Sequence, residues 1–266
     1  MLIFLRELKR NRKAFAIWVL ILIGFNAMMF AFFPSLSGEA QKIKDLMDVY
    51  PDSMKSAFGL DRLEMSTIMG FYGINNYLYI VLLGSIYAML LGAGILSKEE
   101  SDGTIEFLLS KPVTRNKIVT GKALCVLFYI LLFNIIITAA NFIFFEIFKK
   151  EAYSIKAFVL VSVGPLLLHL TFSAIGFFIS MFIVKAKAIY PIAIGAVMGA
   201  YLISIISSIS EKAEPLKYIT PFKYVDASEL ISEEKIRIVY LAIVFFVITA
   251  SITASYVIYN KKDITV

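Results

Sequence analysis

Six long apolar stretches recur along this chain of 266 residues and leave few folds open to it. A helix needs about 20 mainly apolar residues to cross the roughly 30 Å hydrocarbon layer of a membrane. Backbone polar groups find no partner in lipid, so each stretch must form a helix rather than a loop or an open strand. We therefore predict an all-α polytopic membrane protein with six transmembrane helices. The predicted spans are 14–33, 74–96, 123–145, 157–184, 189–210 and 238–259.

The composition agrees with that class of protein. Apolar residues make up 59% of the chain and charged residues 17%, whereas a soluble domain has about half and about a quarter. The first apolar stretch is too long for the core of a secretory signal, and no small-residue cleavage pattern follows it. We expect a retained anchor and a single transmembrane domain over residues 1–266, with no separate catalytic domain.

Lys and Arg near the ends of spans predict the orientation, because cytosolic loops carry an excess of them. The segments 1–13, 97–122, 185–187 and 261–263 fall on one side and sum to a net charge of +8, against −2 for the other side. We therefore expect both termini to be cytosolic. The basic excess then reflects topology and contact with lipid head groups, and it does not indicate binding to nucleic acid.

Residues 1–13 place Met1, Phe4, Leu5 and Leu8 on one helical face and the charges elsewhere. This pattern predicts a helix that lies in the membrane interface, although a frayed basic terminus with only a topological role is the alternative. The loops 34–73 and 211–237 are predicted to contain short helices. Those of the second loop are expected to dip toward the bilayer.

Chemical motifs are scarce. Gly121-Lys122 resembles the end of a P-loop, but Ala123 follows it and Asn116 stands where the first glycine belongs. We therefore expect no ATP hydrolysis by this chain alone. Cys125 is expected to be a packed apolar residue. His169, the only histidine, is interpreted as a side chain bonded to a neighbouring helix, with a catalytic role inside the membrane as the alternative.

Small and polar residues mark two of the spans. Gly84, Ala88 and Gly92 lie four apart in the second span, and Gly195 and Gly199 do so in the fifth. Such faces allow helices to approach closely, either within one chain or between two copies. Five polar residues near the outer ends of these spans either line a polar cavity or satisfy one another's hydrogen bonds. These candidates for a translocation path are Asn75, Asn76, Ser204, Ser207 and Ser208.

The segment between the second and third spans, residues 97–122, is unusually rich in charge for a connector. Asp102-Gly103-Thr104 predicts a helix start with Glu106 in its first turn. The helix 104–110 would end at Pro112, and Thr114 would cap the next helix. From the residues alone, a docking platform for another protein and a solvated loop both remain open.

One family shares this pattern. "SKEESDGTIEFLLSKPVTRNKIVTGK", residues 97–122, resembles the cytosolic signature of ABC-2-type transporter permeases: an acidic cluster, G-T-x-E-x-L-L, x-P-x-[ST]-R and a final G-K. "YITPFKYVDASEL", residues 218–230, is similar to the aromatic segment before the last span in small bacterial members. The number of spans agrees as well, so the resemblance covers the whole chain.

The resemblance implies the membrane-spanning permease of an ATP-driven exporter. Two six-span copies, expected to be a homodimer, would each dock a separate cytosolic ATP-binding subunit, which would hold the ATP and magnesium. Residues 97–122 would contain the coupling helix, braced by the N-terminal helix. The coupling residues carried over from the family are Glu99, Glu100, Asp102, Gly103, Thr104, Glu106, Pro112, Thr114, Arg115 and Lys122. No cofactor is expected in this chain itself.

The expected location is the bacterial cell membrane. Two other classes of function stay open: a non-transporting sensor or immunity subunit that uses the same docking surface, and an intramembrane enzyme with His169 as its base. The family exports lipids, peptide antibiotics, ions and polysaccharides, and the sequence does not single out one of them.

Overall fold

Six long helices form the protein in its computed structural model, which describes residues 2–39, 42, 45, 49, 55, 61–101, 103, 113–183, 185–209 and 211–262. All six are long and apolar enough to cross a membrane, which confirms the predicted number of membrane-spanning helices. No strand occurs in the described part, so the all-α prediction is confirmed too. The long helices are α1 (Leu2–Gly38), α5 (Tyr77–Ser101), α7 (Arg115–Phe148), α8 (Ile155–Ile179), α9 (Ile189–Ile209) and α11 (Ile238–Lys261).

Short helical elements connect the long ones. Three of them lie between α9 and α11, which confirms the short helices predicted for 211–237. A π-helical turn, η1, leads directly into α5. The short elements are α4 (Ile68–Phe71), η1 (Tyr72–Asn76), η2 (Ala186–Ala188), η3 (Glu211–Tyr218), η4 (Pro221–Val225) and α10 (Ala227–Ser232).

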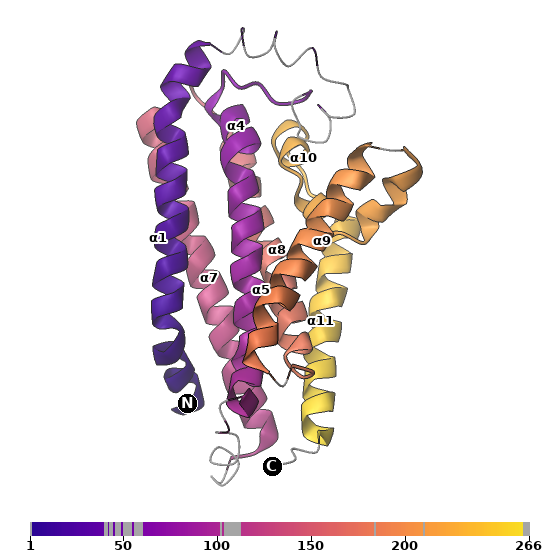
Figure 1. The fold of residues 1–266 in the computed structure, drawn as a ribbon. Helices are drawn as coiled ribbons and strands as arrows, with labels where there is room; N and C mark the ends of the chain where they lie inside the picture. The colour runs from indigo at the N-terminus through magenta and orange to yellow at the C-terminus, as the bar shows by residue number, and fades with distance from the viewer. Residues whose placement is uncertain are drawn as a thin grey trace.

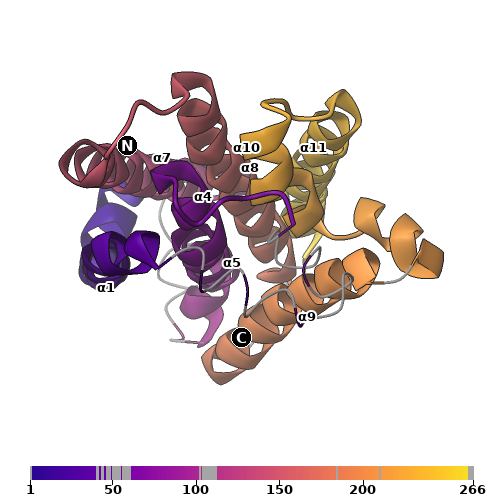
Figure 2. The same cartoon turned by 90° about the horizontal axis from the view of Figure 1, so that it is seen from above.

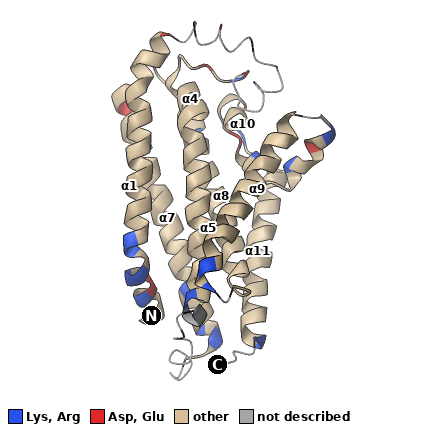
Figure 3. Ribbon diagram, in the orientation of Figure 1, with Lys and Arg blue, Asp and Glu red and all other residues tan. Residues whose placement is uncertain are grey.

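The helices run side by side as a bundle (Figure 1). We call the end where α1 begins and α11 ends the basic end, because Lys and Arg gather there (Figure 3). The opposite end, where α10 lies, is the far end. Both chain termini thus lead away from one end of the bundle, as the predicted topology requires. Which side of the membrane this end faces stays a prediction.

Several helix ends differ from the predicted span boundaries, and two of them change the expected architecture. α1 is one continuous helix from Leu2 to Gly38 with Pro34 inside it, so residues 2–13 belong to the same helix as the first span and do not form a separate one. The placement of these residues in the membrane interface stays a prediction. α8 ends at Ile179, where Ser180 forms the C-cap and turns follow. The apolar residues 181–183, which were predicted to continue the span, therefore lie beyond the helix.

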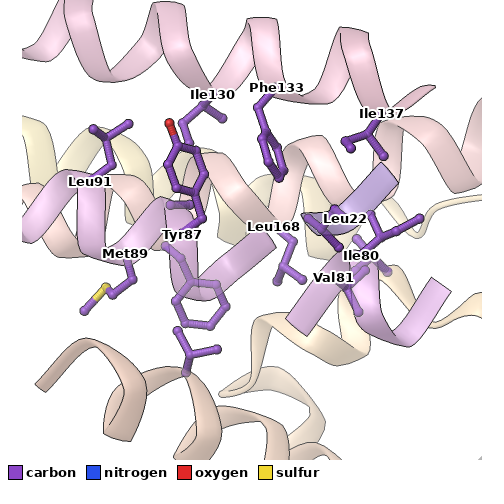
Figure 4. Close-up of a cluster of buried hydrophobic side chains, with 14 of the residues drawn as sticks. Leu22, Ile80, Val81, Tyr87, Met89, Leu91, Ile130, Phe133, Ile137 and Leu168 are labelled. Atoms are coloured by element: carbon purple, nitrogen blue, oxygen red, sulfur yellow. The ribbon is translucent and has the colours of Figure 1, made fainter. Parts of the chain in front are cut away.

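The centre of the bundle is α5 (Figure 2). Of the 18 most apolar consecutive residues in each span, 78% are buried in the span that contains α5 and 22% in the span that contains α9. Figure 4 shows Tyr87 of α5 close to Phe133 of α7, and their ring centroids are 5.0 Å apart. The indole of Trp18 reaches Tyr87 from α1 with a centroid distance of 5.9 Å. Aromatic packing therefore joins three of the spans around one tyrosine.

The small residues of α5 allow α8 to approach closely. A Cβ added at Gly92 would lie 2.3 Å from the carbonyl oxygen of Ser173, and one at Gly176 would lie 2.6 Å from that of Met89. Glycines on both helices thus bring two backbones into contact. The sequence left open whether the face of Gly92 packs within one chain or between two copies. In the structure it packs within one chain.

Candidate functional site

The predicted coupling region, residues 97–122, joins α5 to α7 at the basic end. Gly103 has a φ of 64°, the left-handed conformation that often follows the end of a helix, and α5 ends just before it, at Ser101. Part of the region lies outside the described residues, including the predicted helix 104–110. The same holds for Asp102, Thr104, Glu106 and Pro112 and for the side chains of Glu99 and Glu100. Their contacts therefore stay predictions.

Thr114 begins α7 as predicted. Its side-chain oxygen accepts a hydrogen bond from the backbone nitrogen of Lys117 at 3.4 Å. This is the bond that an N-cap threonine makes to one of the free amides of the first helical turn. α7 therefore starts at a fixed residue within the coupling region.

Arg115, the first residue of α7, holds the end of the last helix. Its guanidinium donates to the carbonyl oxygens of Tyr259 and Asn260, both at 3.1 Å, and of Lys262 at 2.7 Å. The last carbonyls of a helix have no partner within it, and they carry the negative end of its dipole. Arg115 therefore supplies the charge and the donors that the end of α11 needs.

Lys122, about two turns of helix after Arg115, forms a buried ion pair. Its Nζ lies 3.1 Å from Oε1 of Glu7, and the two side chains are 0% and 1% exposed. The same Nζ donates to the carbonyl oxygen of Ile95, and the side chain of Asn11 donates to the backbone oxygen of Glu7 at 3.0 Å. One lysine thus links α7 to α1 and to the last part of α5.

This burial separates Lys122 from the surface on which a partner protein could dock. If Lys122 contributes to coupling, it therefore acts through its contacts with α1 and α5. Its direct contact with a partner stays a prediction that the geometry does not support. Glu7 was not singled out from the sequence. Its signal was that it is the one acid among five bases in residues 1–13, but no local pattern pairs it with a lysine so far along the chain.

His169 lies buried among three helices. Its Nδ1 is 3.0 Å from Oδ1 of Asn134 on α7, and its Nε2 is 3.2 Å from the carbonyl oxygen of Ile80 on α5. The interpretation as a histidine bonded to neighbouring helices is confirmed. A neutral imidazole donates through one ring nitrogen only, so the tautomer decides which of these two oxygens accepts the hydrogen bond.

A cavity of about 100 Å³ lies at the far end, between α5, α9 and the loop with η4 and α10. Ser204 and Ser208, two of the predicted path residues, line it. The others do not lie on its wall. Its remaining lining comprises Leu63, Gly73, Ile74, Tyr77, Leu78, Val81, Tyr201, Ile205, Phe222, Lys223, Val225, Asp226, Ala227 and Ser228.

The other three path candidates make hydrogen bonds elsewhere. Ser207 donates to the carbonyl oxygen of Ser204 at 2.7 Å, and the Asn75 amide donates to the carbonyl oxygen of Phe71 at the end of α4. The Asn76 amide donates to Oδ1 of Asn26 on α1 at 3.1 Å. The structure thus brings two of the five candidates together at a cavity and turns Asn76 toward a neighbouring span.

An ion pair closes one side of the cavity. Nζ of Lys223 lies 2.7 Å from Oδ2 of Asp226, and Oδ1 accepts from the backbone nitrogen and hydroxyl of Ser228 at 3.0 and 2.7 Å. Burial acts to raise the pKa of Asp226, but the lysine charge and these hydrogen bonds outweigh it and hold the pKa below the usual range. Asp226 is therefore ionised and internally balanced at neutral pH.

Comparison with known proteins gives one family. Residues 1–264 match a family described as ABC-2 family transporter protein. No curated protein matches the chain.

Proposed function

Because this chain belongs to the ABC-2 family of transporters, we propose that it is the permease of an ATP-driven exporter and couples to a separate cytosolic ATP-binding subunit. A chain of this family with six membrane-spanning helices is a multi-pass permease subunit of an ABC transporter. The direction of transport, the docking surface and the number of copies belong to the proposal.

The construction of the basic end carries the proposal. The segment 102–114 follows the end of α5 at Ser101, six residues after Ile95, and leads into α7 at Arg115. On both sides the adjoining helix is tied to others: Lys122 holds α1 and α5, and Arg115 holds α11. A displacement of this segment by a partner would therefore move four spans together. This is the mechanical property that a coupling region requires.

The ATP and magnesium would be bound by the partner. The chain lacks two defining residues of a P-loop, so hydrolysis is assigned to the separate subunit. Six helices cannot alone enclose an alternating-access path, and two ATP-binding subunits must meet to sandwich ATP. We therefore propose two copies of this chain, as a homodimer in a bacterial cell membrane, with two ATP-binding subunits.

The test is stimulation of ATP hydrolysis. The chain and its ATP-binding subunit are reconstituted together in lipid nanodiscs, and hydrolysis is compared with that of the free subunit. Glu106→Lys should abolish most of the stimulation without preventing insertion, because the reversed charge would face the partner's cations. Glu146→Lys, at the far end of α7 where Glu146 pairs with Lys149 at 2.6 Å, is the matched control. Full stimulation by Glu106→Lys would refute the docking surface, and no stimulation by the unaltered chain would refute the function.

The orientation has its own test, which uses the two ends of α11. In a Cys125→Ala chain, a cysteine at Lys261 should react with an impermeant reagent only from the cytosol. A cysteine at Lys235, which precedes the other end of the helix, should react only from outside. The reverse pattern would place the coupling region on the wrong side for an ATP-binding subunit.

A further inference from the structure

We propose that the cavity at the far end is a binding site for an organic ammonium group carried on an apolar body. The inference rests on the proposed function only in taking this cavity as part of the route of the exported compound. Binding itself requires no ATP-binding subunit and can be measured on this chain alone.

Three hydroxyl groups of the cavity already use their hydrogens in bonds to backbone carbonyls. Tyr77 donates to the carbonyl oxygen of Val225 at 2.8 Å, Ser204 to that of Tyr201 at 2.8 Å, and Ser208 to that of Ser204 at 3.0 Å. A hydroxyl has one hydrogen and two lone pairs. These three side chains therefore offer acceptors to a ligand, which must supply the donors or a positive charge.

Aromatic rings contribute the second feature. Tyr77, Tyr201 and Phe222 all line the cavity, and the rings of Tyr201 and Phe222 pack edge to face with centroids 5.5 Å apart. The face of an aromatic ring carries negative potential and attracts ammonium ions, including quaternary ones. Aromatic rings and hydroxyl oxygens in the lining of one cavity favour a cation over an anion.

The lysine of the cavity does not cancel this preference. Lys223 lies 2.7 Å from Asp226, and the carboxylate accepts two further hydrogen bonds from Ser228. Because the pair is neutral as a whole, its field falls off quickly and repels a nearby cation far less than an unpaired lysine would. The carboxylate also leaves the cavity with no excess of positive charge.

The volume of the cavity and its apolar lining indicate the size and the polarity of the ligand. A volume of about 100 Å³ corresponds to a few water molecules at about 30 Å³ each, so it holds a head group and not a whole amphiphile. Ile74, Leu78, Val81 and Ile205 make much of the remaining wall apolar. Ile74 belongs to the π-helical turn η1, and such turns often occur at functional sites. The ligand class is a small amine or quaternary ammonium on an apolar body.

Charge-selective modification tests this preference directly. The full chain with Cys125→Ala and Ser208→Cys is placed in nanodiscs and treated with cationic and anionic methanethiosulfonates. Ile219→Cys, which replaces a far-end residue that is 66% exposed, serves as the matched control. The ratio of cationic to anionic rates should be about tenfold higher at 208 than at 219, as expected for a cation–π site. An equal or reversed ratio would overturn the proposal.

Protection identifies the ligand group. Tetramethylammonium should slow the reaction of Ser208→Cys with a neutral reagent, whereas benzenesulfonate should not. Tyr201→Leu should remove the protection and Tyr201→Phe should keep it, because only the first change removes the ring. Protection that persists in Tyr201→Leu, or none in the unaltered cavity, would contradict the assignment.

A second pair of variants covers the case in which Tyr201→Leu does not fold. Ser204→Ala removes one acceptor from the cavity and should weaken the protection. Ser255→Ala removes an equivalent bond to the carbonyl oxygen of Ser251, on α11 and away from the cavity, and should leave it unchanged. Equal protection in both variants would count against the acceptor wall. Protection seen in a chain that stimulates no ATP hydrolysis would refute the exporter function and leave the binding site standing.

Discussion

α5 and α9 carry similar small-residue faces but use them differently. Gly84 and Gly92 of α5 meet α8 so closely that an added Cβ would lie 2.3 Å from an atom of that helix in either case. Gly195 and Gly199 of α9 have nothing within 4 Å of such a Cβ. A small-residue face therefore indicates that a helix can be approached, but the packing of the whole bundle decides whether its own chain does so.

The loop that follows α9 holds this helix by a buried hydrogen bond and an aromatic contact, whereas α5 is held by close packing against α8. The hydroxyl of Thr220, in the loop after α9, donates to the carbonyl oxygen of Ala200 at 2.6 Å, and the threonine is fully buried. Phe222 of the same loop packs on Tyr201. The loop thus returns to the middle of α9, and the face with Gly195 and Gly199 stays open to lipid or to a second copy.

We expect the largest loss of folding stability from a substitution at Gly92. Gly92→Val would place its side chain against backbone atoms of Ser173 and Phe177, which cannot move without shifting α8. We expect a loss of about 3 kcal/mol or more, the upper range for overpacking, seen as a lower unfolding temperature and a poor yield of folded chain. Gly195→Val on α9 makes the same change in open space. Similar losses of stability in the two variants would show that the small-residue faces of α5 and α9 do not differ in packing.

Gly84 should show an intermediate effect. The Cβ of Gly84→Ala would lie 2.3 Å from Nε2 of His169, so the ring must leave its bond to the Ile80 carbonyl. We expect a loss of about 2 kcal/mol, from the clash and a broken buried hydrogen bond. Because the two residues touch, the effects of Gly84→Ala and His169→Ala should be less than additive. A strictly additive double variant in thermal unfolding would show that the ring does not occupy this space.

Thr220 should have a smaller effect, confined to α9. Thr220→Val keeps the shape but removes the donor to Ala200, at a cost of about 1 kcal/mol. Thr171→Val on α8 is the matched control, because Thr171 donates only to Leu167 of its own helix. Hydrogen exchange of the α9 amides should rise in the first variant alone. Equal exchange in both variants would show that the loop does not hold α9.

The smallest effect on the stability of one chain is expected at Gly199. Gly199→Leu adds bulk where nothing lies within 4 Å, so its unfolding should change by no more than about 0.5 kcal/mol. If the open face pairs with a second copy, the variant should lose the dimer and its transport. The mass of the complex by native mass spectrometry decides this. An unaltered dimer in the variant would move the interface to another helix.

Much of the fold could be predicted because it depends on local physics. Hydrocarbon thickness sets the length of each span, so six helices followed from the apolar stretches alone. Thr114 was recognised as a cap because capping is a property of neighbouring residues. The extension of α1 through Pro34 could not be foreseen, since a proline in the last turns of a long helix is tolerated or not according to its surroundings.

The candidate site was less predictable, because its contacts join distant parts of the chain. The partners Glu7 and Lys122 are 115 residues apart, and Arg115 reaches carbonyls up to 147 residues away. No local sequence pattern predicts such long-range pairs. Asn76 looked like a lining residue of a path, but the rotation of its helix turns its amide toward Asn26. Helix type and length are local, whereas the rotation of each helix is set by all its neighbours.

The packing of Trp18 on Tyr87 has a spectroscopic consequence. Trp18 is the only tryptophan of the chain, and its ring on α1 lies 5.9 Å from that of Tyr87 on α5. Indole emission shifts and changes in yield when the surroundings of the ring change, and a neighbouring tyrosine transfers excitation to it only at short range. The unlabelled protein therefore carries its single indole emitter at the contact between its first and second spans, and the emission should change if these two helices move apart.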